Sequence, residues 1–90
     1  MTGYKRAGLV QAPIDHSVFE KAVLDAIDKI RDAGSHTFDV NHIEHVNNWI
    51  RDTSTSVRIA HLLERYDIET YTLHGGCAGR KQFVVPEVQL

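Results

Sequence analysis

Apolar positions recur with a helical period in three stretches of the chain. The first stretch covers residues 17–33, where apolar side chains share one helix face and charged side chains cover the other. Ser17 and Glu20 form an S-x-x-E capping box, which predicts the start of this helix, and Gly34 predicts its left-handed end. The expected buried face consists of Phe19, Ala22, Val23, Ala26, Ile27 and Ile30.

A short strand and a second helix are predicted next. Residues 36–40 alternate and contain β-forming side chains, which favours a strand. Asn41 and Glu44 repeat the capping pattern, so a helix is expected over residues 42–50 with Asn41 as its N-cap. Its expected buried edge consists of Ile43, Val46, Trp49 and Ile50.

The third helical stretch follows a tight polar break at residues 51–53, where Asp52 or Thr53 is the expected N-cap. The helix is predicted to reach Tyr66, and Asp67 is expected to take the left-handed ending. Its apolar stripe is Ile59, Leu62, Leu63 and Tyr66. Ser54, Arg58, His61 and Arg65 are interpreted as the opposite face, a row of hydrogen-bond donors without an acid.

The C-terminal part is predicted to form a β-hairpin. Residues 69–74 and 82–85 alternate, a loop with three glycines separates them, and Pro86 ends the pairing. At the other end, residues 1–13 show no sustained period and are expected to form a flexible arm that either docks as a strand or stays loose. The folded domain is therefore expected over residues 14–90.

Composition agrees with one small globular domain. The 90 residues are 42% hydrophobic and 24% charged, which allows a single core. We expect no transmembrane helix, because no run of about 18 apolar residues occurs, and no secretory signal. The single cysteine, Cys77, excludes an intrachain disulfide and suits a reducing, cytoplasmic location.

Charge is distributed unevenly along the chain, although the net charge of −2 disfavours a strongly DNA-binding protein. Residues 14–39 hold six acids and three bases, whereas residues 51–81 hold five bases and four acids. The first helix is thus the acidic side of the domain, and the C-terminal half is less negative.

The order of predicted elements resembles the winged helix-turn-helix superfamily. The resemblance covers Ser17 to Val85 and depends on the helix pair over residues 41–66 followed by the hairpin over residues 69–85. It implies an α+β fold: three helices, a short strand before the second helix, and a C-terminal β-hairpin wing. It also implies that the third helix enters the major groove of double-stranded DNA while the wing contacts the backbone or minor groove.

The resemblance assigns DNA contacts to particular residues of this chain. Arg58 is the first candidate for reading a base, because arginine pairs bidentately with guanine. Hydroxyls near the helix start would hold phosphates, and Lys5 and Arg6 would contact DNA from the arm. The complete candidate set is Ser54, Thr55, Ser56, Arg58, His61 and Arg65 on the third helix, with Arg80 and Lys81 at the wing.

Two readings compete with this expectation. Arg58 and Arg65 are also explained as side chains that solvate an exposed helix, and winged helices also serve as protein-interaction modules, for example as phage- or plasmid-type inhibitors or adaptors.

A monomer with about five usable bases should bind DNA weakly. If DNA is the partner, we therefore expect a homodimer acting as a transcriptional regulator or a DNA-processing accessory factor.

Metal binding and catalysis have little support in the sequence. His42 and His45 lie one helical turn apart, and His74 and Cys77 have ligand-like spacing, but the two pairs are expected to lie far from each other. The glycine-rich loop matches neither a phosphate loop nor a dinucleotide fingerprint. We therefore expect no metal, no cofactor and no enzymatic activity.

Overall fold

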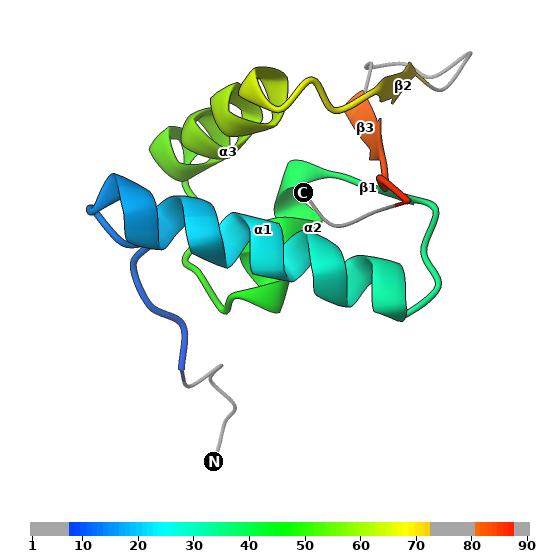
Figure 1. Ribbon diagram of the computed structural model, residues 1–90. Helices are drawn as coiled ribbons and strands as arrows, with labels where there is room; N and C mark the ends of the chain where they lie inside the picture. Colours follow the sequence, from blue (N-terminus) through cyan, green and yellow to red (C-terminus); the bar gives the residue numbers. More distant parts are fainter. Residues whose placement is uncertain (1–7, 73–80, 88–90) are drawn as a thin grey trace.

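Three helices and a small antiparallel sheet make up the computed structural model, which describes residues 8–72 and 81–87 (Figure 1). The helices are α1 (His16–Asp32), α2 (Val40–Val46) and α3 (Thr53–Arg65). The strands are β1 (Thr37–Phe38), β2 (Thr70–Thr72) and β3 (Lys81–Val84). The fold is therefore α+β, as the sequence predicted.

Helix α1 begins one residue after its N-cap. The capping-box prediction was wrong at this point, because Asp15 is the N-cap: its Oδ1 accepts the amides of Ser17 and Val18 at 2.9 and 3.2 Å. Ser17 also donates its hydroxyl to Asp15 at 2.7 Å, and these hydrogen bonds lower the pKa of the Asp15 carboxyl. A carboxylate one residue before the helix outcompetes the serine as acceptor. Gly34 has φ +90°, which confirms the predicted left-handed stop.

Helix α2 is shorter and starts earlier than predicted. Asp39, not Asn41, is its N-cap and accepts the His42 amide at 2.9 Å, so β1 ends before Asp39. The helix stops at Val46 because Asn48 takes φ 57° and turns the chain. Trp49 is consequently buried outside the helix, whereas Ile50, predicted to be buried, is exposed.

The N-terminal segment docks at this same turn. Val10 forms a parallel β-bridge with Trp49: its amide donates to the Asn48 carbonyl and its carbonyl accepts the Ile50 amide, both at 2.8 Å. Ala12, two residues on, is buried. The arm was predicted either to dock as a strand or to stay loose, and at Val10 it docks through an isolated β-bridge.

The sheet has the strand order β1–β3–β2, with both pairs antiparallel. Phe38 pairs with Phe83, and Thr70 pairs with Phe83 on the other side of β3. The two strands of the predicted hairpin therefore pair with each other, and β1 extends the sheet beyond β3. The predicted glycine-rich loop at residues 75–79 lies outside the described residues.

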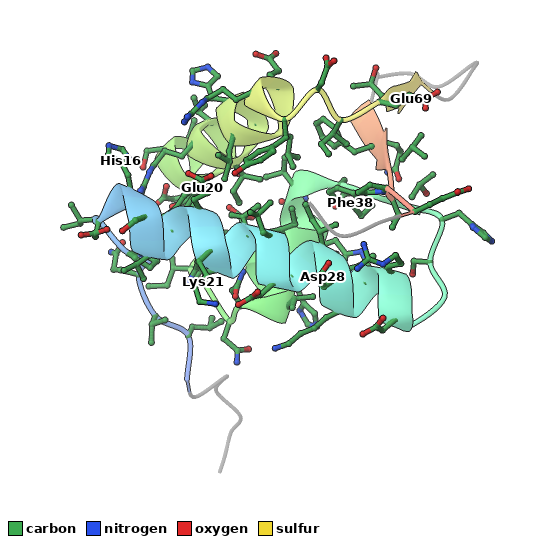
Figure 2. The ribbon with its side chains drawn as sticks, viewed as in Figure 1. His16, Glu20, Lys21, Asp28, Phe38 and Glu69 are labelled. Carbon is green, nitrogen blue, oxygen red and sulfur yellow. The ribbon has the colours of Figure 1, made fainter. Side chains whose placement is uncertain are left out.

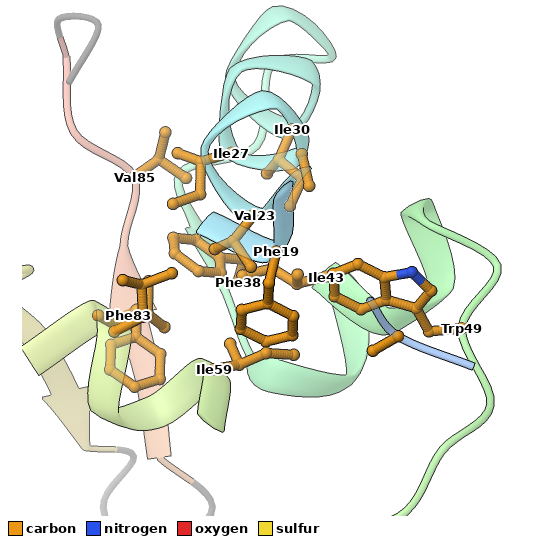
Figure 3. Packing of buried hydrophobic residues seen from close by; sticks show 14 residues of the cluster. Phe19, Val23, Ile27, Ile30, Phe38, Ile43, Trp49, Ile59, Phe83 and Val85 are labelled. Carbon is orange, nitrogen blue, oxygen red and sulfur yellow. The ribbon is translucent and has the colours of Figure 1, made fainter. Parts of the chain in front are cut away.

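One hydrophobic core joins the helices to the sheet (Figure 3). Helix α2 packs against both α1 and α3. The rings of Phe19 and Trp49 stack with centroids 5.1 Å apart and planes 8° apart, and Phe38 stacks on Phe83 at 5.7 Å. The predicted inner faces of α1 and α3 supply most of the remaining core, namely Val23, Ala26, Ile27, Ile30, Ile59, Leu62 and Leu63.

Candidate nucleic-acid interface

Helix α3 carries most of the residues that the sequence assigned to DNA. It begins where predicted, with Asp52 as N-cap accepting the Thr55 amide at 2.9 Å. It ends as predicted, with Asp67 at φ 60°. Hydrogen bonds, first from the Thr55 amide and then from the Ser54 hydroxyl, lower the pKa of the Asp52 carboxyl. A carboxylate that stays charged thus occupies the N-terminal end of α3.

The hydroxyl residues near this end already have partners or are buried. Ser54 is exposed, but its Oγ donates to Asp52 at 2.9 Å. Thr55 is only 4% exposed. Ser56 is half-buried and its Oγ donates to the Glu44 carboxylate at 3.0 Å. The Ser54 and Ser56 hydroxyls, which were predicted to bind phosphates, therefore already donate to two carboxylates of the same chain.

The polar row and the apolar stripe of α3 were predicted to lie on opposite faces, but they lie closer together around the helix. Each residue advances the helix by about 100°, so the stripe containing Arg58 lies only about a quarter turn from the apolar stripe. The residues farthest from the core are Val57, which is 45% exposed, and Glu64, which is also exposed. The predicted row of Ser54, Arg58, His61 and Arg65 contains no acid, but the exposed Glu64 lies beside it on the outward face.

Arg58 lies against the core instead of projecting away from it. Its guanidinium carbon is 3.8 Å from the centroid of the Phe19 ring, a cation–π contact across the space between α3 and α1. Its Nη2 atom is buried and has no hydrogen-bond partner in the described part of the chain. His61 and Arg65, by contrast, are exposed on the adjoining turns of α3.

The wing residues are described only in part. Lys81 is the first residue of β3 and pairs with Thr72 across the hairpin. Arg80 lies outside the described residues, as do Lys5 and Arg6 of the arm and the possible ligands His74 and Cys77. In the ranges that are described, no three histidine, cysteine or acidic side chains gather closely enough to hold a metal ion.

A buried carboxylate of α2, which the sequence did not predict, forms a hydrogen bond with α3. Glu44 of α2 is 0% exposed and accepts the Ser56 hydroxyl. The Asn41 amide, oriented by its hydrogen-bond partners, donates to Glu44 Oε1 at 3.1 Å and accepts from Arg51 Nη2 at 3.0 Å. Glu44 was interpreted as part of a capping box, and no local pattern reveals partners that lie seven and twelve residues further along the chain.

Burial raises the pKa of the Glu44 carboxyl, against the opposing effects of Ser56 and Arg51. Above the unfolded-state pKa, near the ordinary 4.5, the folded protein then binds more protons than the unfolded chain. The contribution of Glu44 to stability is complete below that pH and is lost as the pH rises through the folded-state pKa.

The variant Glu44→Gln should therefore remove a decrease in the free energy of unfolding between pH 4.5 and neutral pH. The amide oxygen can still accept from Ser56, so the fold should be retained. Urea denaturation at several pH values, with exposed Glu69→Gln as the control, measures the slope. An unchanged slope in Glu44→Gln would show that the carboxyl titrates as it does in the unfolded chain.

A groove lies beside α3 on the side away from α1. Its volume is about 570 Å³, and it runs between the start of α2, the α2–α3 turn, α3 and β3. The apolar part of its wall comes from Val40, Val57, Ala60 and Phe83, and the rim carries Asp39, Arg51 and Asp52. An apolar floor with a charged rim is suited to contact with another macromolecule.

Comparison with known protein families, curated proteins and solved structures finds no match to this chain. None of the described helices combines the length and the apolar character that crossing a membrane requires.

Proposed function

We propose that this domain is a winged helix-turn-helix protein that binds double-stranded DNA, with α3 in the major groove. The supporting observation is the placement of α3: it follows α2 after a tight turn, packs by one stripe and leaves its other side exposed. The hairpin β2–β3 follows directly and is joined to β1 in one sheet. This arrangement presents a helix and a hairpin that can contact DNA together.

The exposed edge of α3 defines the proposed contact residues. His61 and Arg65 form no ion pair with any carboxylate of the described residues, and Ser54 and Val57 share their face. Arg65 would contact a phosphate, and Val57 would contact a thymine methyl group. Arg58 is less suited to base reading than the sequence suggested, because its guanidinium lies on Phe19. Lys81 and Arg80 remain the proposed wing contacts.

We further propose that the domain acts as a homodimer in regulation or DNA processing. The contact residues include few bases, and affinity for DNA rises with the number of phosphates neutralised. Exposed apolar side chains occur at the start of α1, where Ile14 is 91% exposed and Val18 also projects into solvent. Pairing through this end would double the number of phosphate contacts and cover these side chains.

The double variant Arg65→Ala/Lys81→Ala should bind a duplex about tenfold more weakly or worse. Each lost phosphate contact should also lower the slope of log affinity against log salt by about 1. Fluorescence anisotropy with duplexes from a random-sequence pool measures both, and light scattering on the same samples gives the mass of the complex.

The matched control is the double variant Lys21→Ala/Lys29→Ala, because both lysines are exposed on α1 and their loss changes the net charge by the same amount. If this control and Arg65→Ala/Lys81→Ala bind DNA equally well, then α3 and the wing are not the contact surface.

The groove beside α3 favours a second candidate, a protein-interaction module. Its apolar wall at Val57 and Ala60 is accessible, and the acids at its rim reduce the attraction for a polyanion. The substitution Ala60→Glu should then abolish recovery of a stoichiometric protein partner that survives nuclease treatment. Under the DNA proposal, no such partner is recovered.

A further inference from the structure

A small cationic cleft lies between the first turns of α1 and the outer flank of α3. Its volume is about 160 Å³, far above the roughly 10–15 Å³ that one water molecule requires. His16 of α1 and Arg58, His61 and Arg65 of α3 line it, together with the Phe19 ring. Figure 2 shows His16 and Glu20 on the part of α1 that approaches α3.

Four nitrogen-bearing side chains meet in this cleft, and none of them forms a salt bridge within the described residues. Salt bridges in the described part of the chain involve only Lys21 with Asp25 and Arg31 with Asp28, both elsewhere on α1. The α1 amides are not the donors here, because Asp15 accepts those of Ser17 and Val18. The positive character of the cleft therefore comes from side chains.

Arg58 is held in position although one of its nitrogens has no acceptor among the described residues. Its guanidinium carbon lies 3.8 Å from the centroid of the Phe19 ring, and the buried Nη2 remains without a hydrogen-bond partner in the described ranges. A buried donor on a charged group that lacks a partner is costly, and an ordered water molecule or a bound ion would satisfy it. Arg58 also lines the cleft, where the accessible part of its guanidinium can donate a charge-assisted hydrogen bond to an oxyanion.

Glu20 is the one carboxylate in the cleft wall. It accepts a hydrogen bond from the Tyr66 hydroxyl, and this hydrogen bond raises the pKa of Tyr66, so the hydroxyl keeps its proton. The carboxylate is thus bound at the side of the cleft by a neutral donor. Two arginines and one glutamate give the cleft a positive formal charge.

We infer that this cleft is a binding site for a phosphoryl group. Arg58 donates from the fixed position on Phe19, and Arg65, His61 and His16 donate from the two sides of the opening. The phosphoryl group belongs either to the DNA backbone or to a small phosphorylated molecule, and both present the same tetrahedral oxyanion.

Titration of the isotopically labelled protein with pyrophosphate, in the absence of DNA, tests this site directly. Saturable shifts are expected in the side-chain resonances of Arg58, His61 and His16. Arg65→Gln and Arg58→Gln should each weaken binding about tenfold, Arg58→Lys should weaken it less, and Glu20→Gln should strengthen it. The control is Lys29→Gln, which lies about 20 Å further along α1.

Arg65 is exposed, so Arg65→Gln tests the site even if Arg58→Gln fails to fold. Shifts that do not saturate, or equal affinities in Arg65→Gln and Lys29→Gln, would overturn the site. A second arm adds duplex DNA: competition between the duplex and pyrophosphate identifies a backbone phosphate, whereas independent binding identifies a small molecule. The pyrophosphate result does not depend on whether the domain binds DNA.

Discussion

Phe19→Ala is expected to lower the free energy of unfolding by about 3–5 kcal/mol, the usual cost of removing a buried phenylalanine. Phe19 is 3% exposed and stacks on the indole of Trp49. The substitution loses the burial of the ring, opens a cavity next to Trp49 and removes the aromatic contact. A domain of this size is stabilised by only about 5–15 kcal/mol, so a large part of its stability would be lost.

Urea denaturation followed by circular dichroism measures this effect. The matched control is Val18→Ala, since Val18 precedes Phe19 but points into solvent, and its removal should change stability by less than about 0.5 kcal/mol. A cost below about 1 kcal/mol for Phe19→Ala would be too small for a core position and would contradict the contact between α1 and Trp49.

The same substitution also links stability to the proposed phosphoryl site. The Phe19 ring carries the Arg58 guanidinium, so its removal frees Arg58 to adopt other rotamers. The aromatic ring at position 19 thus serves both the core and the cleft, which explains why an arginine is tolerated so close to the hydrophobic interior.

Phe38→Ala is expected to have a comparable effect, about 3–5 kcal/mol. Phe38 is 2% exposed and is the only buried residue of the two-residue strand β1. It pairs with Phe83 in register, and the two rings stack. Without this ring, β1 has little apolar surface to hold it against β3, and the sheet should lose its third strand.

Amide hydrogen exchange provides a local measurement beside the denaturation experiment. The Val85 amide donates to the His36 carbonyl at 2.9 Å, so its protection reports the attachment of β1. Protection should fall in Phe38→Ala and persist in Thr37→Ala, where the neighbouring side chain is exposed. If Val85 stays protected in Phe38→Ala, the strand is held by its backbone rather than by Phe38.

The periodic pattern predicted the existence and order of the elements because burial of one face determines where helices and strands form. The inner faces of α1 and α3 are the predicted ones, and the Asp52 cap and the left-handed Asp67 were found from local chemistry. The errors concern competition between neighbours. Asp15 and Asp39 act as caps in place of Ser17 and Asn41, because in each case a carboxylate is available two residues earlier.

The candidate site was harder to predict, since it depends on contacts between distant segments. Arg58 follows the polar pattern of α3, and only its distance to Phe19 shows that it faces α1. Glu44 has the sequence context of a cap and is instead buried beneath Ser56. A charged residue at the border of an apolar stripe can lie either against the core or in solvent. Its partners in the folded chain determine which of the two it does.

The docking of Val10 beside Trp49 has a practical consequence for studying this protein. Trp49 is the only tryptophan of the chain, and it lies where the N-terminal segment, α1 and the α2–α3 connection meet. Its fluorescence emission therefore arises from one junction, without an added label. A binding event that moves the helices apart would therefore shift the wavelength of maximum emission of this single tryptophan.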